Sequence, residues 1–179
     1  MITKRDKLML NYLREYKCAH TKTLARFYPD IPTARRRLKI LYESKEIARC
    51  RDNINTEYIH YITKPKQLRH SVLLTDFLRE FSRLAEIKNC KTEVVIGNVR
   101  ADAMVGYIYN SKPRLAFVEI QISNTPLDTL KYEKLYYSGT WKDKLPEFPL
   151  IIAVTDRKIP VTDLKVIQVS EDLILKGGF

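Results

Sequence analysis

Two acidic residues in the segment RADAMVGYIYNSKPRLAFVEIQ, residues 100–121, could carry out chemistry together. A hairpin with a four-residue turn at 110–113 would place Asp102 opposite Gln121 and leave Glu119 diagonal to Asp102 on the same sheet face. Two converging carboxylates suit a hard cation such as Mg²⁺ or Mn²⁺, which polarises a phosphate and activates water. The segment therefore predicts a metal site at Asp102 and Glu119, with Gln121 beside it.

Phosphodiester cleavage also needs a positive charge near these acids, and Gln121 cannot supply one. A neutral amide can hold a water molecule by hydrogen bonds but cannot offset the charge of a pentavalent phosphate. Lys131 or Lys134, on a helix expected at 126–138, could reach in instead, and Tyr132 could contact a phosphate. The alternative, which we favour, is a solvated helix face with the tyrosine packed against the sheet.

The first third of the chain carries most of its net positive charge. The chain of 179 residues has a formal net charge of +11, and residues 1–65 contain 15 Lys and Arg against 7 Asp and Glu. Residues 66–179 contain 17 against 14. A compact basic module favours an anionic partner such as nucleic acid, and the alternative is a basic surface that serves only solubility.

Three helices and a hairpin are expected in this basic part. Apolar periodicity predicts a first helix at 4–17, a second that begins at Thr21 and a third in TARRRLKILYES. Two β-prone runs follow in EIARCRDNINTEYIHYIT, on either side of a turn at 52–55. This order is typical of a winged helix-turn-helix domain, whose recognition helix enters the major groove of DNA.

The spacing of apolar residues in the third helix indicates which of its basic residues face outward. The apolar positions recur at helical offsets, at Ala34, Leu38 and Leu41. Arg36 and Lys39 fall on the opposite face and are the first candidates to enter a DNA groove, followed by Arg35. Arg37 lies next to the apolar face and is the least suited to contact DNA.

Two further arginines, Arg49 and Arg51, lie in the first strand of the expected hairpin. A wing at this position would add contacts to phosphates, which fix the register of a protein on the duplex. Together with the third helix they predict double-stranded DNA as the partner of a domain at 1–65. The alternative is a three-helix bundle whose exposed face happens to be basic.

A second domain is expected at 66–179, after a charged linker that contains Pro65. It begins with an amphipathic helix in SVLLTDFLREFSRLAEI. The further elements are expected in this order: a strand at 92–96, the hairpin described above, a helix at 126–138, and strands at 149–155 and 164–170. Such an order predicts an α/β (α+β) fold. No phosphate loop, Gly-x-Ser-x-Gly or His-Glu-x-x-His motif occurs in the sequence.

Several segments together resemble a known family. They are RRLKILYESKEIARC, RHSVLLTDFLRE, RADA, FVEIQIS and LKYEKLYYSGTW, which span most of residues 3–155. The chain is similar to the replication-relaxation proteins of plasmids and mobile elements, and its second half resembles the PD-(D/E)XK nuclease fold. The resemblance implies a winged helix followed by a nuclease-like domain, and DNA binding in replication, relaxation or copy control of a plasmid, phage or other mobile element.

Two departures from that pattern bear on cutting activity. Ala101 stands where a Pro is expected before the Asp, and Gln121 stands where a Lys is expected. The second departure removes a charge, so we expect the nuclease-like domain to be inactive. One alternative is a Mg²⁺-dependent endonuclease, and another is a transcriptional regulator whose C-terminal domain forms a homodimer or senses a partner. Replication or regulatory proteins of the host element are further expected partners, and a role in protein binding alone is a third alternative.

Composition argues against several other classes of protein. The 3 Cys are far apart and lack Cys-x-x-Cys or Cys/His spacing, so neither a disulfide framework nor a zinc site is indicated. The sequence MITKRDKLML has no apolar run of signal-peptide length, and no stretch approaches the roughly 18 apolar residues of a membrane span. We therefore expect a cytoplasmic protein that does not bind membranes.

Overall fold

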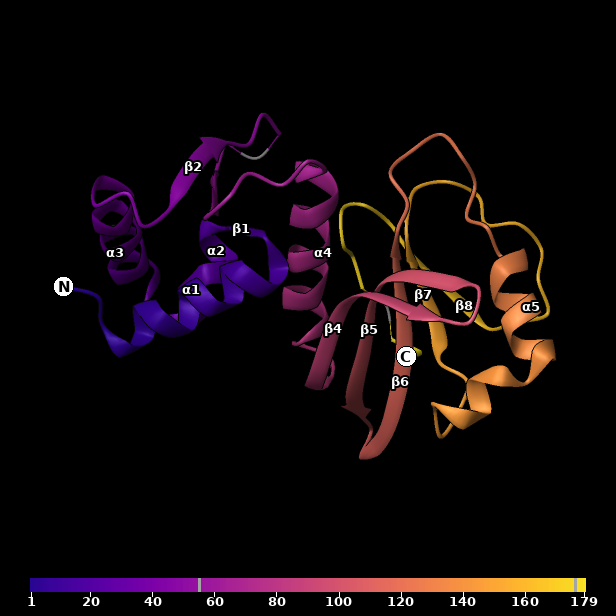
Figure 1. The fold of residues 1–179 in the computed structure, drawn as a ribbon. Coiled ribbons are helices and arrows are strands. Elements are labelled where there is room, and N and C mark those ends of the chain that lie inside the picture. The colour runs from indigo at the N-terminus through magenta and orange to yellow at the C-terminus, as the bar shows by residue number, and fades with distance from the viewer. Residues whose placement is uncertain (55, 176) are drawn as a thin grey trace. The chain divides into compact units, whose positions relative to one another are not determined.

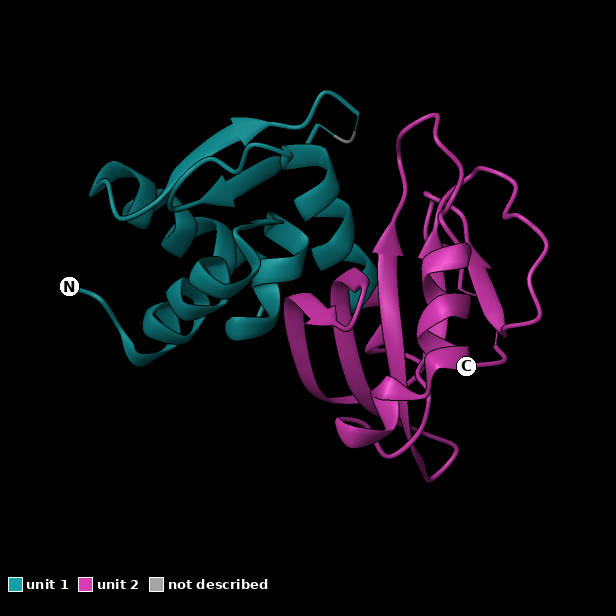
Figure 2. Cartoon of the chain, turned by 45° about the vertical axis from the view of Figure 1, so that its right-hand side comes forward, with its two compact units in different colours: residues 1–79 teal, residues 80–179 magenta. Residues whose placement is uncertain are grey.

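The computed structural model describes residues 1–54, 56–175 and 177–179. These residues form two compact units, Met1–Arg79 and Glu80–Phe179, coloured separately in Figure 2. The sequence places the boundary at 65/66, whereas the structure divides the chain near the end of helix α4 (Leu68–Phe81). Helices and sheets occur together, which confirms the predicted mixed α and β composition.

The first unit combines short helices with a small antiparallel sheet (Figure 1). In chain order its elements are α1 (Lys4–Tyr16), β1 (Cys18–His20), α2 (Thr21–Leu24), the 3-10 helix η1 (Ala25–Phe27), α3 (Ile31–Glu43), β2 (Ala48–Arg51), β3 (Tyr58–Tyr61) and α4. The strand order is β1-β3-β2. The sequence predicts only β2 and β3, because three residues are too few for an alternating pattern to indicate β1. Asn55 of the predicted turn lies outside the described residues.

Local signals explain where the helices of the first unit begin and end. The Thr3 side chain accepts a hydrogen bond from the Asp6 amide, and the Asp6 carboxylate accepts one from the Thr3 amide, which completes a capping box. Asp30 caps α3 through the Thr33 amide. Helix α2 ends at Leu24, and the 3-10 helix η1 that follows it ends at Phe27, two residues before Pro29, which cannot continue a helix.

The second unit is built on one mixed sheet. Its elements are β4 (Glu86–Ile96), β5 (Val99–Tyr109), β6 (Lys112–Ile120), α5 (Leu130–Ser138), the 3-10 helix η2 (Thr140–Asp143), β7 (Leu150–Val154) and β8 (Val166–Val169). The strand order is β4-β5-β6-β7-β8, antiparallel up to β6 and parallel from β6 to β8. Helix α5 connects β6 to β7 (Figure 1), and its Tyr132 and Leu135 belong to the same buried cluster as Phe117 of β6 and Ile151 of β7. No helix among the described residues has the length and apolar character needed to cross a bilayer.

The helix predicted in SVLLTDFLREFSRLAEI is shorter at its C-terminal end than the sequence indicates. It ends at Phe81, and β4 begins at Glu86 because the residues that follow pair with β5. Leu84, placed on the apolar face of the helix by its spacing, is exposed. Long-range pairing with β5 therefore overrides the helical pattern here.

The hairpin that carries the acidic residues has a tighter turn than predicted. Asn110 and Ser111 both have positive φ, 49° and 61°, and Tyr109 pairs with Lys112, so the turn has two residues rather than four. The predicted register is therefore wrong by two positions, and the ladder ends with Ala103 opposite Val118. A shift of two residues does not change which face a side chain occupies, so the predicted sharing of one face survives the correction.

Candidate functional site

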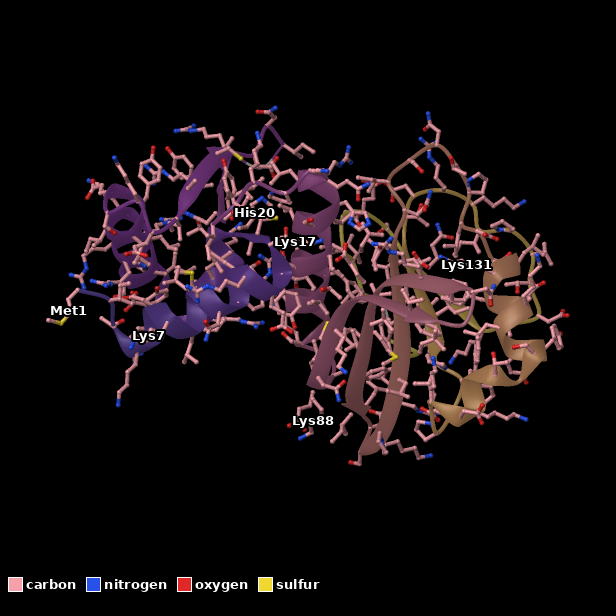
Figure 3. The ribbon with its side chains drawn as sticks, viewed as in Figure 1. Met1, Lys7, Lys17, His20, Lys88 and Lys131 are labelled. Carbon is pink, nitrogen blue, oxygen red and sulfur yellow. The ribbon has the colours of Figure 1, made fainter. Side chains whose placement is uncertain are left out.

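A buried carboxylate lies at the centre of the predicted acidic site. Glu119, near the end of β6, is 7% exposed. Its Oε1 accepts hydrogen bonds from the Lys131 ammonium at 2.6 Å and from the Tyr132 hydroxyl. Lys131, labelled in Figure 3, also donates to the carbonyl oxygen of Arg100 at 3.1 Å. The first turn of α5 thus delivers a cation and a hydroxyl to the same carboxylate.

Burial dominates the electrostatics of this cluster. Burial raises the pKa of Glu119, and although hydrogen bonds from Lys131 and Tyr132 lower it and Asp102 raises it, the pKa stays above its usual range. Burial, followed by the charge of Glu119, raises the pKa of Tyr132 as well. The tyrosine therefore keeps its proton and donates a hydrogen bond to Glu119.

Asp102 supports the strand that carries Glu119. Its Oδ2 accepts a hydrogen bond from the Ile120 amide at 2.7 Å, just beyond the last ladder pair between β5 and β6. At this point β6 leaves β5 and continues its pairing with β7. The half-buried Asp102 side chain therefore satisfies a backbone donor where one ladder ends.

The remaining predicted residues of the acidic site lie differently. The Gln121 amide donates to the Ser123 hydroxyl and to the Thr125 carbonyl oxygen, both at 2.6 Å, so it holds the loop after β6. Lys134 is exposed on α5. The structure thus brings together Asp102, Glu119, Lys131 and Tyr132, whereas Gln121 serves its own loop.

These side chains are a poor fit for Mg²⁺ or Mn²⁺. One oxygen of Asp102 is bonded to a backbone amide, and one oxygen of Glu119 accepts from two donors. Across the described part of the chain, no group of three or more His, Cys, Asp or Glu side chains is arranged to hold a metal ion. A divalent cation would also have to approach Glu119 against the Lys131 ammonium, which already supplies its positive charge.

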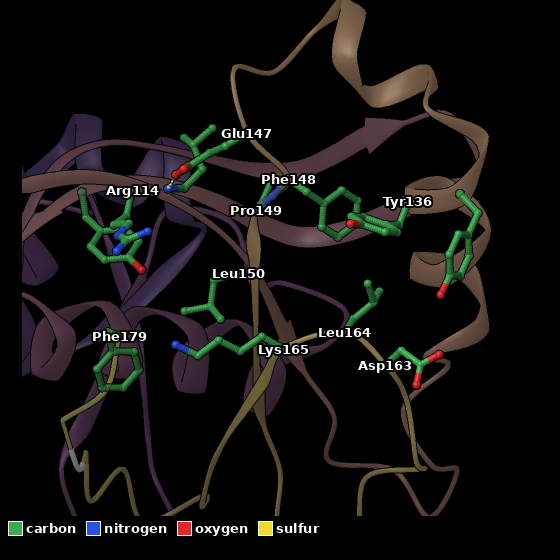
Figure 4. A pocket seen from close by; sticks show the side chains of 13 residues that line it. Arg114, Tyr136, Glu147, Phe148, Pro149, Leu150, Asp163, Leu164, Lys165 and Phe179 are labelled. Atoms are coloured by element: carbon green, nitrogen blue, oxygen red, sulfur yellow. Dashed lines mark hydrogen bonds between the residues drawn. The ribbon is translucent and has the colours of Figure 1, made fainter.

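The second unit also contains a cavity of about 470 Å³ (Figure 4). Arg114 and Phe179 lie on one side of it, and Tyr136 and Asp163 lie on the other. Its lining includes none of the four clustered residues. Lys165 at its edge donates to the carbonyl oxygen of Gly178. The cavity is therefore a different site from the predicted metal site.

The predicted DNA-binding residues of α3 are on its exposed side. Arg35, Arg36 and Lys39 are exposed, and the Lys39 ammonium lies 3.8 Å from Glu43, one turn further along the helix. Arg37 points the other way, and its guanidinium lies 2.5 Å from the buried Asp6 carboxylate. Three cations of α3 therefore face solvent, and the fourth, Arg37, forms an ion pair with Asp6 inside the unit.

Aromatic rings hold the two predicted arginines of β2. The Arg49 guanidinium lies 4.3 Å from the ring centroid of Tyr42 and 4.1 Å from that of Tyr58. Arg51 lies 5.4 Å from the Tyr58 ring, and its hydrogen bond lowers the pKa of that tyrosine. Such stacking orients a guanidinium while leaving its N–H groups at the edge.

Sequence reasoning missed the two tyrosines. A usable signal was present for Tyr42, because Arg35, Lys39 and Tyr42 follow one another at spacings of four and three and so share one helix face. The pairing of Tyr42 with Arg49 depends on how α3 packs beside β2, which no local pattern indicates.

The burial of charged and titratable side chains in the first unit could not be predicted from local patterns. Asp6 is 0% exposed and accepts hydrogen bonds from Thr3, Tyr28 and Arg37. His20 is 3% exposed and contacts two aspartates. Charged and polar groups are rarely buried unless they are paired, so these networks are strong structural constraints.

The chain was compared with models of protein families, with curated protein sequences and with solved structures. None of the three comparisons found a match.

Proposed function

We propose that the chain binds double-stranded DNA through the exposed face of α3 and the hairpin formed by β2 and β3. The element order of the first unit and its β1-β3-β2 sheet support a winged helix-turn-helix, in which α3 would enter the major groove. The hairpin would then be the wing that contacts phosphates.

One observation carries this proposal: the contact between Arg49 of β2 and Tyr42 of α3. Tyr42 shares a helix face with Arg35 and Lys39, so the contact joins the cation of the hairpin to the basic stripe of the helix. A continuous basic surface built from two elements is the electrostatic footprint expected of a DNA-binding domain.

For the second unit we propose a PD-(D/E)XK-like fold without cutting activity. A meander, a helix and a parallel strand follow one another, and Asp102, Glu119 and Lys131 lie on neighbouring parts of them. Lys131 would supply the positive charge that is missing at position 121, where Gln stands in place of the expected Lys. It forms an ion pair with Glu119. With the resemblance to replication-relaxation proteins, this supports a DNA-binding role in replication, relaxation or copy control of a mobile element.

Removing the two central cations of α3 should weaken DNA binding strongly. We expect the Arg36→Ala, Lys39→Ala double variant to lose about 10- to 100-fold in affinity for duplex DNA at low salt. If both residues contact phosphates, the dependence of log affinity on log salt should become shallower by about 1.8. Gel shifts or fluorescence anisotropy over a salt series measure both quantities.

A matched control removes two exposed cations of the second unit, as Lys142→Ala, Lys144→Ala, and should change affinity far less. Parent-like binding by the α3 double variant would contradict the recognition-helix assignment. A complex with two protein chains on a palindromic duplex would favour a dimeric transcriptional regulator. Absence of any DNA affinity at low salt would favour a role in protein binding alone.

Duplex DNA should remain uncut in Mg²⁺ or Mn²⁺, because the Lys131 ammonium already lies against Glu119 and hydrogen bonds engage one oxygen of Glu119 and one of Asp102. Gel electrophoresis of supercoiled plasmid incubated with the protein measures this directly. Cleavage that appears with metal and is lost in both Asp102→Ala and Glu119→Ala would instead establish the endonuclease alternative.

A further inference from the structure

His20, which is labelled in Figure 3, is the last residue of β1 and lies between two carboxylates. Its Nδ1 is 2.6 Å from Oδ2 of Asp76 on α4, and its Nε2 is 3.0 Å from Oδ2 of Asp52, which follows β2. An ionised carboxylate can only accept hydrogen bonds, so both ring nitrogens must donate. Two such contacts to ionised carboxylates are therefore made best by an imidazolium with both protons in place.

Asp52 also stabilises the turn between β2 and β3. Its Oδ1 accepts a hydrogen bond from the Ile54 amide at 3.0 Å, and its own amide donates to the Glu57 carbonyl oxygen at 2.8 Å. The Glu57 carboxylate lies 2.8 Å from the Lys22 ammonium. The side chain and backbone amide of Asp52 together thus connect His20 to both sides of the turn between β2 and β3.

Asp76 is held more firmly than Asp52. Its other oxygen accepts a hydrogen bond from the Thr23 hydroxyl at 2.8 Å and lies 3.6 Å from the Arg79 guanidinium. The bond to His20 is also shorter on this side. If the ring loses one proton, we expect it to keep its N–H toward Asp76 and to turn a lone pair toward Asp52.

We propose that His20 is a positioning residue for DNA binding: it fixes the β2–β3 hairpin through Asp52, so affinity for DNA falls as pH rises and the ring loses its second proton. This inference rests on the proposed DNA-binding function. It makes the proposed DNA-binding surface sensitive to pH, because the hairpin carries Arg49 and Arg51.

Several charged or titratable groups surround His20. They are Asp76 and Arg79 on α4, Asp52 after β2, His60 on β3, and Cys18 on β1. Burial lowers the pKa of His20, but the hydrogen bonds and charges of the two aspartates outweigh it and leave that pKa above its ordinary value.

Two of these neighbours, His60 and Cys18, have pKa values far from neutral. Burial and the charges of Arg49 and His20 lower the pKa of His60 to about 4. Burial and the charge of Asp76 raise the pKa of Cys18 to about 12. Neither His60 nor Cys18 therefore changes its charge near neutral pH.

The test compares binding of a labelled mixed-sequence duplex from about pH 6 to about pH 9 at constant salt. We expect the affinity of the parent to fall about fivefold or more over this range. In Asp52→Asn the amide can accept from an N–H or donate to a lone pair, so the contact persists in both states of His20. This variant should bind with little change across the range, and His70→Gln should follow the parent.

A second measurement separates this inference from the proposed function. Amide hydrogen exchange of Asp52 and Ile54, expressed as protection factors, follows the turn without DNA. Protection that falls with pH in the parent but not in Asp52→Asn supports the role of His20, even if no DNA binding is found and the proposed function fails. Constant protection in the parent, or an equal loss of DNA affinity with pH in both proteins, overturns the inference.

Discussion

Replacing Asp6 by alanine should lower the free energy of unfolding of the first unit by about 3 kcal/mol or more. Asp6 is fully buried and accepts hydrogen bonds from the Arg37 guanidinium, the Tyr28 hydroxyl and Thr3. Removal of the carboxylate leaves the buried Tyr28 hydroxyl without its acceptor, and it leaves the Arg37 guanidinium, 19% exposed, with the Met1 carbonyl oxygen but without its counter-ion. The loss should appear as a lower midpoint in urea unfolding followed by circular dichroism.

Two further variants serve as comparisons for Asp6→Ala. Asp6→Asn keeps an acceptor for Tyr28 but loses the charge that faces Arg37, so its stability should be intermediate. Asp30→Ala also removes a helix-capping carboxylate, but an exposed one, and should cost clearly less. An Asp6→Ala protein no less stable than Asp30→Ala would contradict the importance assigned to this buried pair.

The same pair predicts a dependence on acid. Burial raises the pKa of Asp6, but the hydrogen bonds from Arg37, Thr3 and Tyr28 outweigh it and lower the pKa to about 2. A group whose pKa is lower in the folded state adds stability above its unfolded pKa of about 3.9. That contribution is lost as pH falls towards about 2. The difference in stability between parent and Asp6→Ala should therefore shrink below about pH 4.

The anchoring of Arg37 matters for the proposed DNA contact as well. Arg36 and Lys39 are exposed, while Arg37 between them is turned inward to Asp6. The pair thus fixes the rotation of α3 about its own axis, which decides which cations face solvent. A helix presents its face accurately only if something on the opposite side holds it.

Local pattern predicted the helices of the first unit and the strands of the second. The helices follow from a 3.6-residue apolar period with polar caps, and β5 and β6 follow from two strand-like runs joined by a turn. The error in register arose because Asn110 and Ser111 adopt left-handed conformations, which the sequence NSKP does not make obvious. Alternation still placed Asp102 and Glu119 on one face, since side-chain direction repeats every two residues.

The partners of the buried charges could not be predicted in the same way. Asp6 and Arg37 are 31 residues apart, and His20 and Asp76 are 56 apart. Nothing in a short window shows that such residues meet, because their contact depends on the packing of whole elements. Lys131 and Glu119 are 12 residues apart, and here the expected order of strand and helix was enough to name the pair as an alternative.

Glu119 should respond in opposite ways to two substitutions. Glu119→Ala removes the acceptor of the buried Tyr132 hydroxyl and of the Lys131 ammonium, and we expect a loss of about 2–3 kcal/mol in the second unit. Glu119→Gln keeps an acceptor for Tyr132 and removes a charge whose burial is unfavourable. The glutamine variant should therefore be as stable as the parent at neutral pH, or more stable.

The sign of the pH dependence follows from the raised pKa of Glu119. Relative to the unfolded chain, folding favours the protonated acid, so its contribution to stability is largest below the unfolded pKa of about 4.3 and falls as pH rises through the folded pKa. Any advantage of Glu119→Gln over the parent should therefore be greatest at neutral pH and disappear on acidification. Urea unfolding at several pH values, followed by the fluorescence of Trp141 in the second unit, measures it.

A glutamine variant that is much less stable than the parent at neutral pH would show that the Lys131–Glu119 ion pair outweighs the cost of burying the charge. That result would also bear on chemistry, because an ion pair so favourable would keep Glu119 ionised and Lys131 in place. A stable glutamine variant would mean instead that the carboxylate is retained at an energetic cost, and residues kept at such a cost are commonly functional.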